Sequence, residues 1–259
     1  MNPRLRSFAL AMLPPLATFI LFVVLWDASV VYFEVEPFQV PRPMAVVRAA
    51  MERKEQIGSG LFLTGSAAAM GFATSLVVGV LVAFLFSQSR VIQRSLYPYA
   101  IFFQTVPIIA VAPLIINWFG HDTRSIVIVS AIVSLFPIIT NTTTGLTELD
   151  RNAVELFELN GATRIQKLFK LQLPNSVPYL IAGARTSSGL SVIGAIIGEF
   201  FAGFGQEKYG LGFLIFQTSS QLKIDAMFAC IVASTLLGLL IFGAVSLVGS
   251  AVLLRWRSN

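Results

Sequence analysis

The sequence predicts an all-α, polytopic membrane protein with six transmembrane helices in a single domain over residues 1–259. Apolar residues make up 56% of the chain and charged residues only 12%, whereas a soluble domain typically carries about 25% charge. The mean hydropathy is +0.79. A helix needs about 20 predominantly apolar residues to cross a bilayer, and it must be a helix because lipid cannot pair with free backbone groups. Six stretches meet this requirement: 8–26, 61–86, 96–118, 124–143, 177–200 and 226–254.

The first stretch, 8–26, follows Arg4 and Arg6 and could be mistaken for a cleavable signal peptide. It is long for such a segment, and no small-x-small cleavage pattern lies at its end, before Trp26-Asp27. We therefore expect it to be retained as the first span.

The next three spans carry packing and kinking signals. In the second span, small residues recur at every fourth position, which lets another helix backbone approach closely, either within one chain or between two copies. Prolines in the third and fourth spans predict kinks, because neighbouring helices can satisfy the carbonyls that proline leaves free. The small residues are Ala67, Gly71, Ser75, Gly79 and Ala83, and the prolines are Pro107, Pro113 and Pro137.

Two connecting segments are longer than simple turns. Residues 37–43 are bounded by prolines and are expected to be extended, and Met44–Gln56 has the spacing of a short amphipathic helix at the membrane interface. The glycine-rich segment 201–225 is typical of either a re-entrant element or an ordinary loop.

The basic residues indicate the orientation in the membrane. If both termini are cytoplasmic, the inner segments carry the larger share of Lys and Arg, and most of the acidic residues lie outside. This is the usual bias of membrane proteins. The net charge of +5 then faces anionic membrane lipid, so it requires no nucleic acid partner.

Polar side chains inside the spans are few, and such residues usually face a cavity or the bundle interior. Those that could line a path through the bundle are Gln104, Asn117, Asn141 and Glu199. For Glu199, near the end of the fifth span, a pore-lining carboxylate and a carboxylate at the outer membrane boundary are both compatible with the sequence.

Catalytic and metal-binding patterns are absent from the sequence. His121 is the only histidine and Cys230 the only cysteine, so we predict no metal site and no catalytic residues. The sequence contains no GxxxxGK[ST] pattern, so this chain does not bind ATP by a P-loop and is predicted to need no cofactor of its own.

The segment 146–176 is polar and basic in an otherwise apolar chain. Thr147–Asp150 resembles a capping box that opens a helix, and Leu149, Ala153, Leu156 and Phe157 then fall on one helix face. Gly161 suits a helix C-cap. Thr163–Gln172 predicts a second short helix with a basic ridge, ended by Leu173-Pro174. The pair could be a hairpin on anionic lipid or a rigid element that docks on a cytosolic protein.

The spacing of this segment resembles the EAA loop of the permease subunits of binding-protein-dependent ABC importers, whose pattern is E-A-A-x3-G-x9-I-x-L-P. The chain departs from the pattern where Leu156 and Phe157 replace the two alanines and Leu171 replaces the isoleucine. Shorter similarities, including Pro41-Arg42-Pro43 and Gly210-Leu211-Gly212, resemble the nitrate, sulfonate, taurine and bicarbonate branch, which includes importers of thiamine precursors. The residues that match the coupling loop are Glu155, Leu156, Phe157, Glu158, Gly161, Ala162, Leu171, Leu173 and Pro174.

The resemblance implies a type I (MetI-like) permease fold in the cell inner membrane. It implies a homodimer bound to a cytosolic ABC ATPase dimer that holds ATP-Mg, with a periplasmic or extracellular binding protein delivering a small anion or a thiamine-precursor-like heterocycle. A secondary transporter driven by an ion gradient is the alternative, but the intramembrane relays and repeated halves typical of that class are not visible. A membrane-embedded enzyme would need a catalytic cluster.

Overall fold

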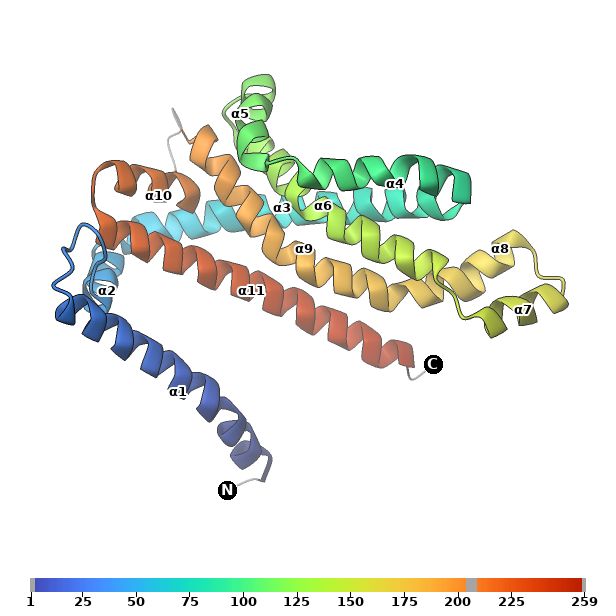
Figure 1. Ribbon diagram of the computed structural model, residues 1–259, viewed down its shortest axis with the longest axis horizontal. Coiled ribbons are helices and arrows are strands. Elements are labelled where there is room, and N and C mark those ends of the chain that lie inside the picture. Colours follow the sequence, from blue (N-terminus) through green and yellow to red (C-terminus); the bar gives the residue numbers. More distant parts are fainter. Residues whose placement is uncertain (1–2, 204–208, 258–259) are drawn as a thin grey trace.

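The computed structural model describes residues 3–203 and 209–257, and the regular elements of this part of the chain are all helices (Figure 1). Within it, five helices are long and apolar enough to cross a membrane: α1 (Pro3–Tyr32), α3 (Lys54–Ser87), α6 (Thr123–Thr147), α9 (Leu173–Ala202) and α11 (Ile224–Arg257). The predicted all-α, polytopic fold is confirmed.

The third predicted span differs from the single helix expected over 96–118. It is divided into α4 (Arg90–Thr105) and α5 (Ile108–Phe119), with Val106 and Pro107 extended between them. Pro107 has no backbone N–H to donate, and it disfavours the helical conformation at the preceding residue. Figure 1 shows α5 turning steeply away from α4 at this point. Pro113 and Pro137, in contrast, lie within helices.

The centre of the molecule is formed by α3, α6 and α9, which pack at close range through small residues. The ridge on α3 faces α6 of the same chain: a Cβ added at Gly71 would overlap Ser130, and one added at Gly79 would lie 2.7 Å from Ile138. Two hydroxyls donate across the α6–α9 contact, from Ser130 to the carbonyl of Ser191 at 2.8 Å and from Ser187 to that of Ser134 at 2.6 Å. The close crossing predicted for the second span therefore lies within the chain.

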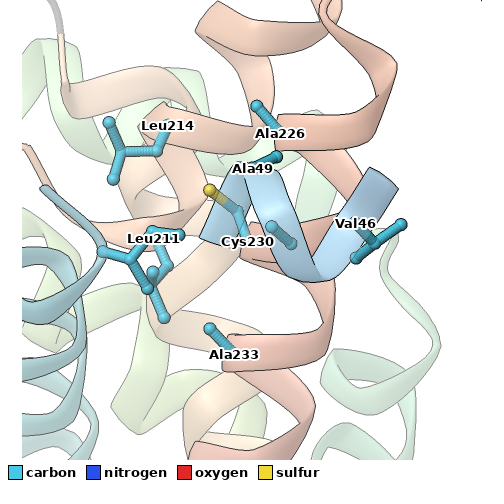
Figure 2. Packing of buried hydrophobic residues seen from close by; sticks show 9 residues of the cluster. Val46, Ala49, Leu211, Leu214, Ala226, Cys230 and Ala233 are labelled. Carbon is cyan, nitrogen blue, oxygen red and sulfur yellow. The ribbon is translucent and has the colours of Figure 1, made fainter. Parts of the chain in front are cut away.

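One end of the bundle, which we call the α10 end, holds α2 (Pro43–Glu52) and α10 (Leu211–Ser220). The predicted interfacial helix Met44–Gln56 is shorter than expected, because α2 ends at Glu52 and α3 begins at Lys54. Figure 2 shows α2, α10 and α11 meeting in an apolar cluster. Cys230 is buried there as a small apolar residue. The labelled members are Val46, Ala49, Leu211, Leu214, Ala226, Cys230 and Ala233.

An ion pair joins the end of α1 to the start of α2. The guanidinium of Arg42 donates from Nε and Nη2 to the two carboxylate oxygens of Asp27, each at 2.9 Å. These hydrogen bonds, together with the nearby negative charge, raise the pKa of Arg42 above its usual value.

The opposite end, which we call the loop end, holds α7 (Arg151–Leu159), α8 (Arg164–Lys167) and the last turns of α11 (Figure 1). The helix α8 continues through the wide turn η1 (Leu168–Gln172) into α9, so that residues Arg164–Ala202 form one unbroken helical segment of 39 residues. The expected helix end at Leu173-Pro174 is therefore wrong.

The wide turn explains how the helix passes Pro174. In an α-helix the proline ring clashes with the carbonyl four residues earlier and cannot donate to it. Here the N–H of Leu173 donates to the carbonyl of Leu168, five residues earlier, which is the spacing of a π turn. This local widening gives the ring room without ending the helix.

Candidate functional site

The first helix of the loop, α7, is opened by Asp150. Its carboxylate accepts from the N–H of Asn152 at 3.4 Å. Thr147, expected as the cap, is instead the last residue of α6, and its hydroxyl donates to the carbonyl of Thr143 at 2.8 Å. Because α6 continues this far, the predicted capping box is wrong by three residues.

The end of α7 is set by Gly161, as predicted. Its φ is +66°, a left-handed conformation that glycine adopts without strain. The N–H of Gly161 donates to the carbonyl of Glu158 at 3.0 Å, and that of Ala162 to the carbonyl of Phe157 at 2.9 Å. These two bonds form a Schellman motif.

The second helix of the loop begins at a capping box. The hydroxyl of Thr163 accepts from the N–H of Gln166, and the side-chain carbonyl of Gln166 accepts from the N–H of Thr163 at 2.8 Å. The direction in which the chain leaves α7 and enters α8 is thus determined by local sequence at both ends of the turn.

The surface of α7 exposes large apolar side chains outside the spans. All nine residues of α7 are described and none is buried; Leu156 is 58% and Leu159 86% exposed. The predicted apolar face is divided, because Ala153 and Phe157 are half-buried whereas Leu156 points outward. Leu156 and Leu159 lie about one turn apart on α7, and contiguous exposed apolar side chains are typical of interaction surfaces.

Two ion pairs frame these leucines. Arg151 and Glu155 pair along α7 at 2.9 Å, and Glu158 on α7 pairs with Lys167 on α8 at 2.9 Å. The second pair connects the two helices across the turn at Gly161. The loop therefore presents a continuous surface, with Leu156 and Leu159 at its centre and the two ion pairs at its edges.

The base of the loop is held by two amide side chains that sequence reasoning did not identify. Asn175 donates from Nδ2 to the carbonyls of Gly145 at 2.8 Å and Glu148 at 3.1 Å, and Gln172 donates to that of Leu146 at 3.2 Å. They satisfy carbonyls at the end of α6 that have no partner within the helix. The available signal was one amide within the Leu-x-Leu-Pro pattern, Gln172, and one directly after it, Asn175.

The residues at the base of the loop that match the coupling-loop pattern are half-buried. Leu171, Leu173 and Pro174 lie where η1 enters α9. Leu173 and Pro174 also border an apolar groove of about 470 Å³ between the loop ends of α3, α6, α9 and α11. These residues connect the loop to α9 and do not form part of its exposed surface.

We expect Asn175→Ala to loosen the base of the loop. Asn175 makes two hydrogen bonds, each worth about 1 kcal/mol, so losing both should raise the population with an open loop about thirtyfold. Tryptic cleavage at Arg151 and Arg164 in detergent measures this opening. Asn152→Ala, at an exposed position on α7, is the control; equal cleavage of both variants would show that Asn175 does not hold the loop.

The four polar candidates of the spans lie on four different helices. Gln104 on α4 and Asn117 on α5 are exposed within the chain. Asn141 on α6 is half-buried and donates to the carbonyl of Pro137 at 2.8 Å. Glu199, at the α10 end of α9, is only 2% exposed.

The carboxylate of Glu199 belongs to a junction of three helices. Its Oε2 accepts from the hydroxyl of Thr64 on α3 at 2.9 Å and from the N–H of Gly212 on α10 at 2.8 Å. Thr64 in turn accepts from the N–H of Leu211 at 2.9 Å. Glu199 does not reach the surface as a boundary carboxylate would. Thr64, which completes the junction, was not identified from the sequence.

The comparisons with known proteins agree with the resemblance of the loop. The family described as "Binding-protein-dependent transport system inner membrane component" matches residues 75–253. The formylaminopyrimidine transport permease protein of Halalkalibacterium halodurans is 32% identical over 248 residues, covering 95% of this chain and 97% of that protein. The riboflavin transport system permease protein of Chloroflexus aurantiacus is 31% identical over 266 residues, covering 100% and 96%.

Among solved structures, the methionine ABC transporter MetNI in an inward-facing conformation has the same fold. The TM-score is 0.65 at 18% sequence identity, over 78% of this chain and 98% of that chain. The fold is therefore that of a type I (MetI-like) permease, and the chain is a multi-pass inner-membrane protein whose ATPase is a separate subunit. This chain belongs to the binding-protein-dependent transport system inner membrane component family, the permease subunits of ABC importers.

Proposed function

We propose that two copies of this permease form the path of an ATP-driven importer for a small, uncharged heterocyclic solute, and that α7 couples this path to the ATPase. The observation that carries the proposal is the exposed surface of α7, with Leu156 and Leu159 between two ion pairs and held rigidly on α9 through α8 and η1.

In the proposed mechanism, α7 docks in a cleft of a cytosolic ATPase, and ATP-Mg binds only to that partner. When the ATPase dimer closes on ATP, the loops of the two permeases approach each other. Because ATP contacts the closed ATPase differently from the open one, its binding shifts the permease from an inward-open to an outward-open state. The residues assigned to this coupling are Glu155, Leu156, Phe157, Glu158, Gly161, Ala162, Leu171, Leu173 and Pro174.

The proposed orientation places the loop end and both termini in the cytoplasm. The loop contributes four basic residues, Arg151, Arg164, Lys167 and Lys170, which favours the cytoplasmic side. The α10 end then faces the binding protein that delivers the solute.

A second copy of the chain would cover α4 and α5. These helices expose Tyr99, Ile109 and Trp118, and also the amides Gln104 and Asn117. Amides are costly against hydrocarbon and are usually sheltered in a bundle or cavity. This favours a partner permease and a solute path, lined by α4 to α6 and α9, over lipid at these positions.

The proposed cargo follows from the charges and the relatives. Arg185 and Glu199 both lie in the predicted span 177–200, Glu199 near its end, and both bond within the chain: Arg185 to Ser250 at 2.9 Å and Glu199 to Thr64 at 2.9 Å. Arg185 faces α11, which does not line the proposed path, and Glu199 is itself acidic, so neither offers a positive charge to an anion there. The relatives at 32% and 31% identity are named for formylaminopyrimidine and riboflavin transport. A heterocycle therefore fits better than nitrate, a sulfonate, taurine or bicarbonate.

The test is reconstitution of the permease with the ATPase and the binding protein of its own transport system in proteoliposomes. We expect binding protein loaded with a formylaminopyrimidine-type heterocycle to raise ATP hydrolysis and to drive uptake. Binding protein exposed to nitrate or a sulfonate should do neither. A permease that retains no ATPase on purification, or uptake that follows an ion gradient without ATP, would contradict the proposal.

A further inference from the structure

The junction at Glu199 is built at close range from three helices that are far apart in the sequence. A Cβ added at Gly210 would overlap the Glu199 carboxylate, and one added at Gly212 would overlap the carbonyl of Ile196 on α9. The start of α10 therefore fits against α9 only as glycine. This packing leaves the first N–H groups of α10 pointing at Thr64 and Glu199.

The buried carboxylate suits this position chemically. The first N–H groups of a helix have no partner within it and carry partial positive charge, so an anion stabilises them. In a low-dielectric interior these hydrogen bonds are strong, and removing one partner leaves the others buried and unsatisfied. The three bonds thus hold α3, α9 and α10 as a unit.

The other end of the same helix carries the loop. The helical segment Arg164–Ala202 has 39 residues, which corresponds to about 58 Å at the usual rise per residue. It reaches from the turn beside α7 to the residue before Gly203, where Glu199 meets α10. A displacement of α8 must therefore reach the α10 end unless the helix bends.

We propose that Glu199 is a positioning residue that fastens α10 to α3 and α9, so that α9 exchanges movement between the coupling loop and the α10 end as one rigid body. Movement passes along this body in both directions. Closure of the ATPase dimer on ATP displaces α10, and docking of the loaded binding protein at the α10 end displaces the loop that contacts the ATPase. This inference rests on the proposed function, but it assigns Glu199 a role away from the solute path.

The test uses the complete transporter in proteoliposomes and measures ATPase activity without and with loaded binding protein, together with uptake. In Glu199→Met, which keeps the approximate length of the side chain but removes the acceptor oxygens, we expect ATPase activity without binding protein to stay unchanged, while stimulation by binding protein and uptake both fall about tenfold. Thr64→Val should act in the same way, whereas Thr64→Ser, which keeps the hydroxyl, should retain both activities. If loaded binding protein does not stimulate the ATPase activity of the unaltered transporter, the proposed function is wrong. That result is distinct from a failure of the role inferred for Glu199, which only the variants test.

Two results would overturn the inference. Glu199→Met or Thr64→Val could keep full stimulation and uptake. Glu199→Met could lose uptake but keep stimulation, which would place Glu199 on the solute path.

Discussion

Replacing Gly161 by proline is expected to reduce uptake about tenfold or more while the protein still inserts in the membrane and reaches normal abundance. Proline holds φ near −65°, whereas Gly161 has a φ of +66°. Proline also removes the N–H that donates to the carbonyl of Glu158 at 3.0 Å. The turn after α7 then cannot form, and the exposed leucines leave their position relative to α8.

Gly161→Asn is the matched control for this prediction. Asparagine tolerates the left-handed conformation better than other residues with a side chain, and a Cβ at Gly161 would meet nothing within 4 Å. We expect this variant to retain uptake and to co-purify with the ATPase, whereas Gly161→Pro should lose the ATPase on purification. Normal uptake by Gly161→Pro would show that the shape of the loop does not matter for coupling.

The second large effect is expected on stability, for Gly194→Ala in the contact between α6 and α9. The added Cβ would lie 2.7 Å from the Cα of Ser130, which is backbone and cannot rotate away. The helices must separate, which weakens the hydrogen bond from Ser130 to Ser191. Overpacking of this kind costs about 1–3 kcal/mol, measured as a lower free energy of unfolding in detergent.

Gly189→Ala provides the control within the same helix. A Cβ at Gly189 would meet nothing within 4 Å, so the substitution removes only the flexibility of glycine and should be neutral or stabilising by up to about 1 kcal/mol. If both variants unfold at the same denaturant concentration or temperature, close approach at Gly194 does not hold α6 and α9 together.

The sequence predicts the parts of this fold that depend on local pattern. Hydrophobic length identifies the spans, the small residues of α3 identify a close crossing, and Gly161 identifies the end of α7. Each of these signals acts within about 20 residues, so no knowledge of distant contacts is needed.

The features that sequence reasoning missed depend on groups that meet only after folding. Thr64 and Glu199 are 135 residues apart, and neither has a local pattern that points to the other. Asn175 resembles any polar residue after a proline until the free carbonyls of α6 are placed beside it. The break at Pro107 and the continuous helix at Pro174 show that proline alone does not decide between the two outcomes. The surrounding backbone hydrogen bonds decide, as the π turn at Leu168–Gln172 shows.

That π turn has a consequence for the direction in which the loop leaves the membrane. A helix advances by about 100° per residue, so the single extra residue in the turn changes the azimuth of α8 about the axis of α9 by roughly that amount. The side of α9 that contacts α6 and the side from which the loop projects are therefore set independently. The extra residue in this turn therefore sets the direction in which α8 and α7 project from α9, while the residues of α9 that pack against α6 keep their positions.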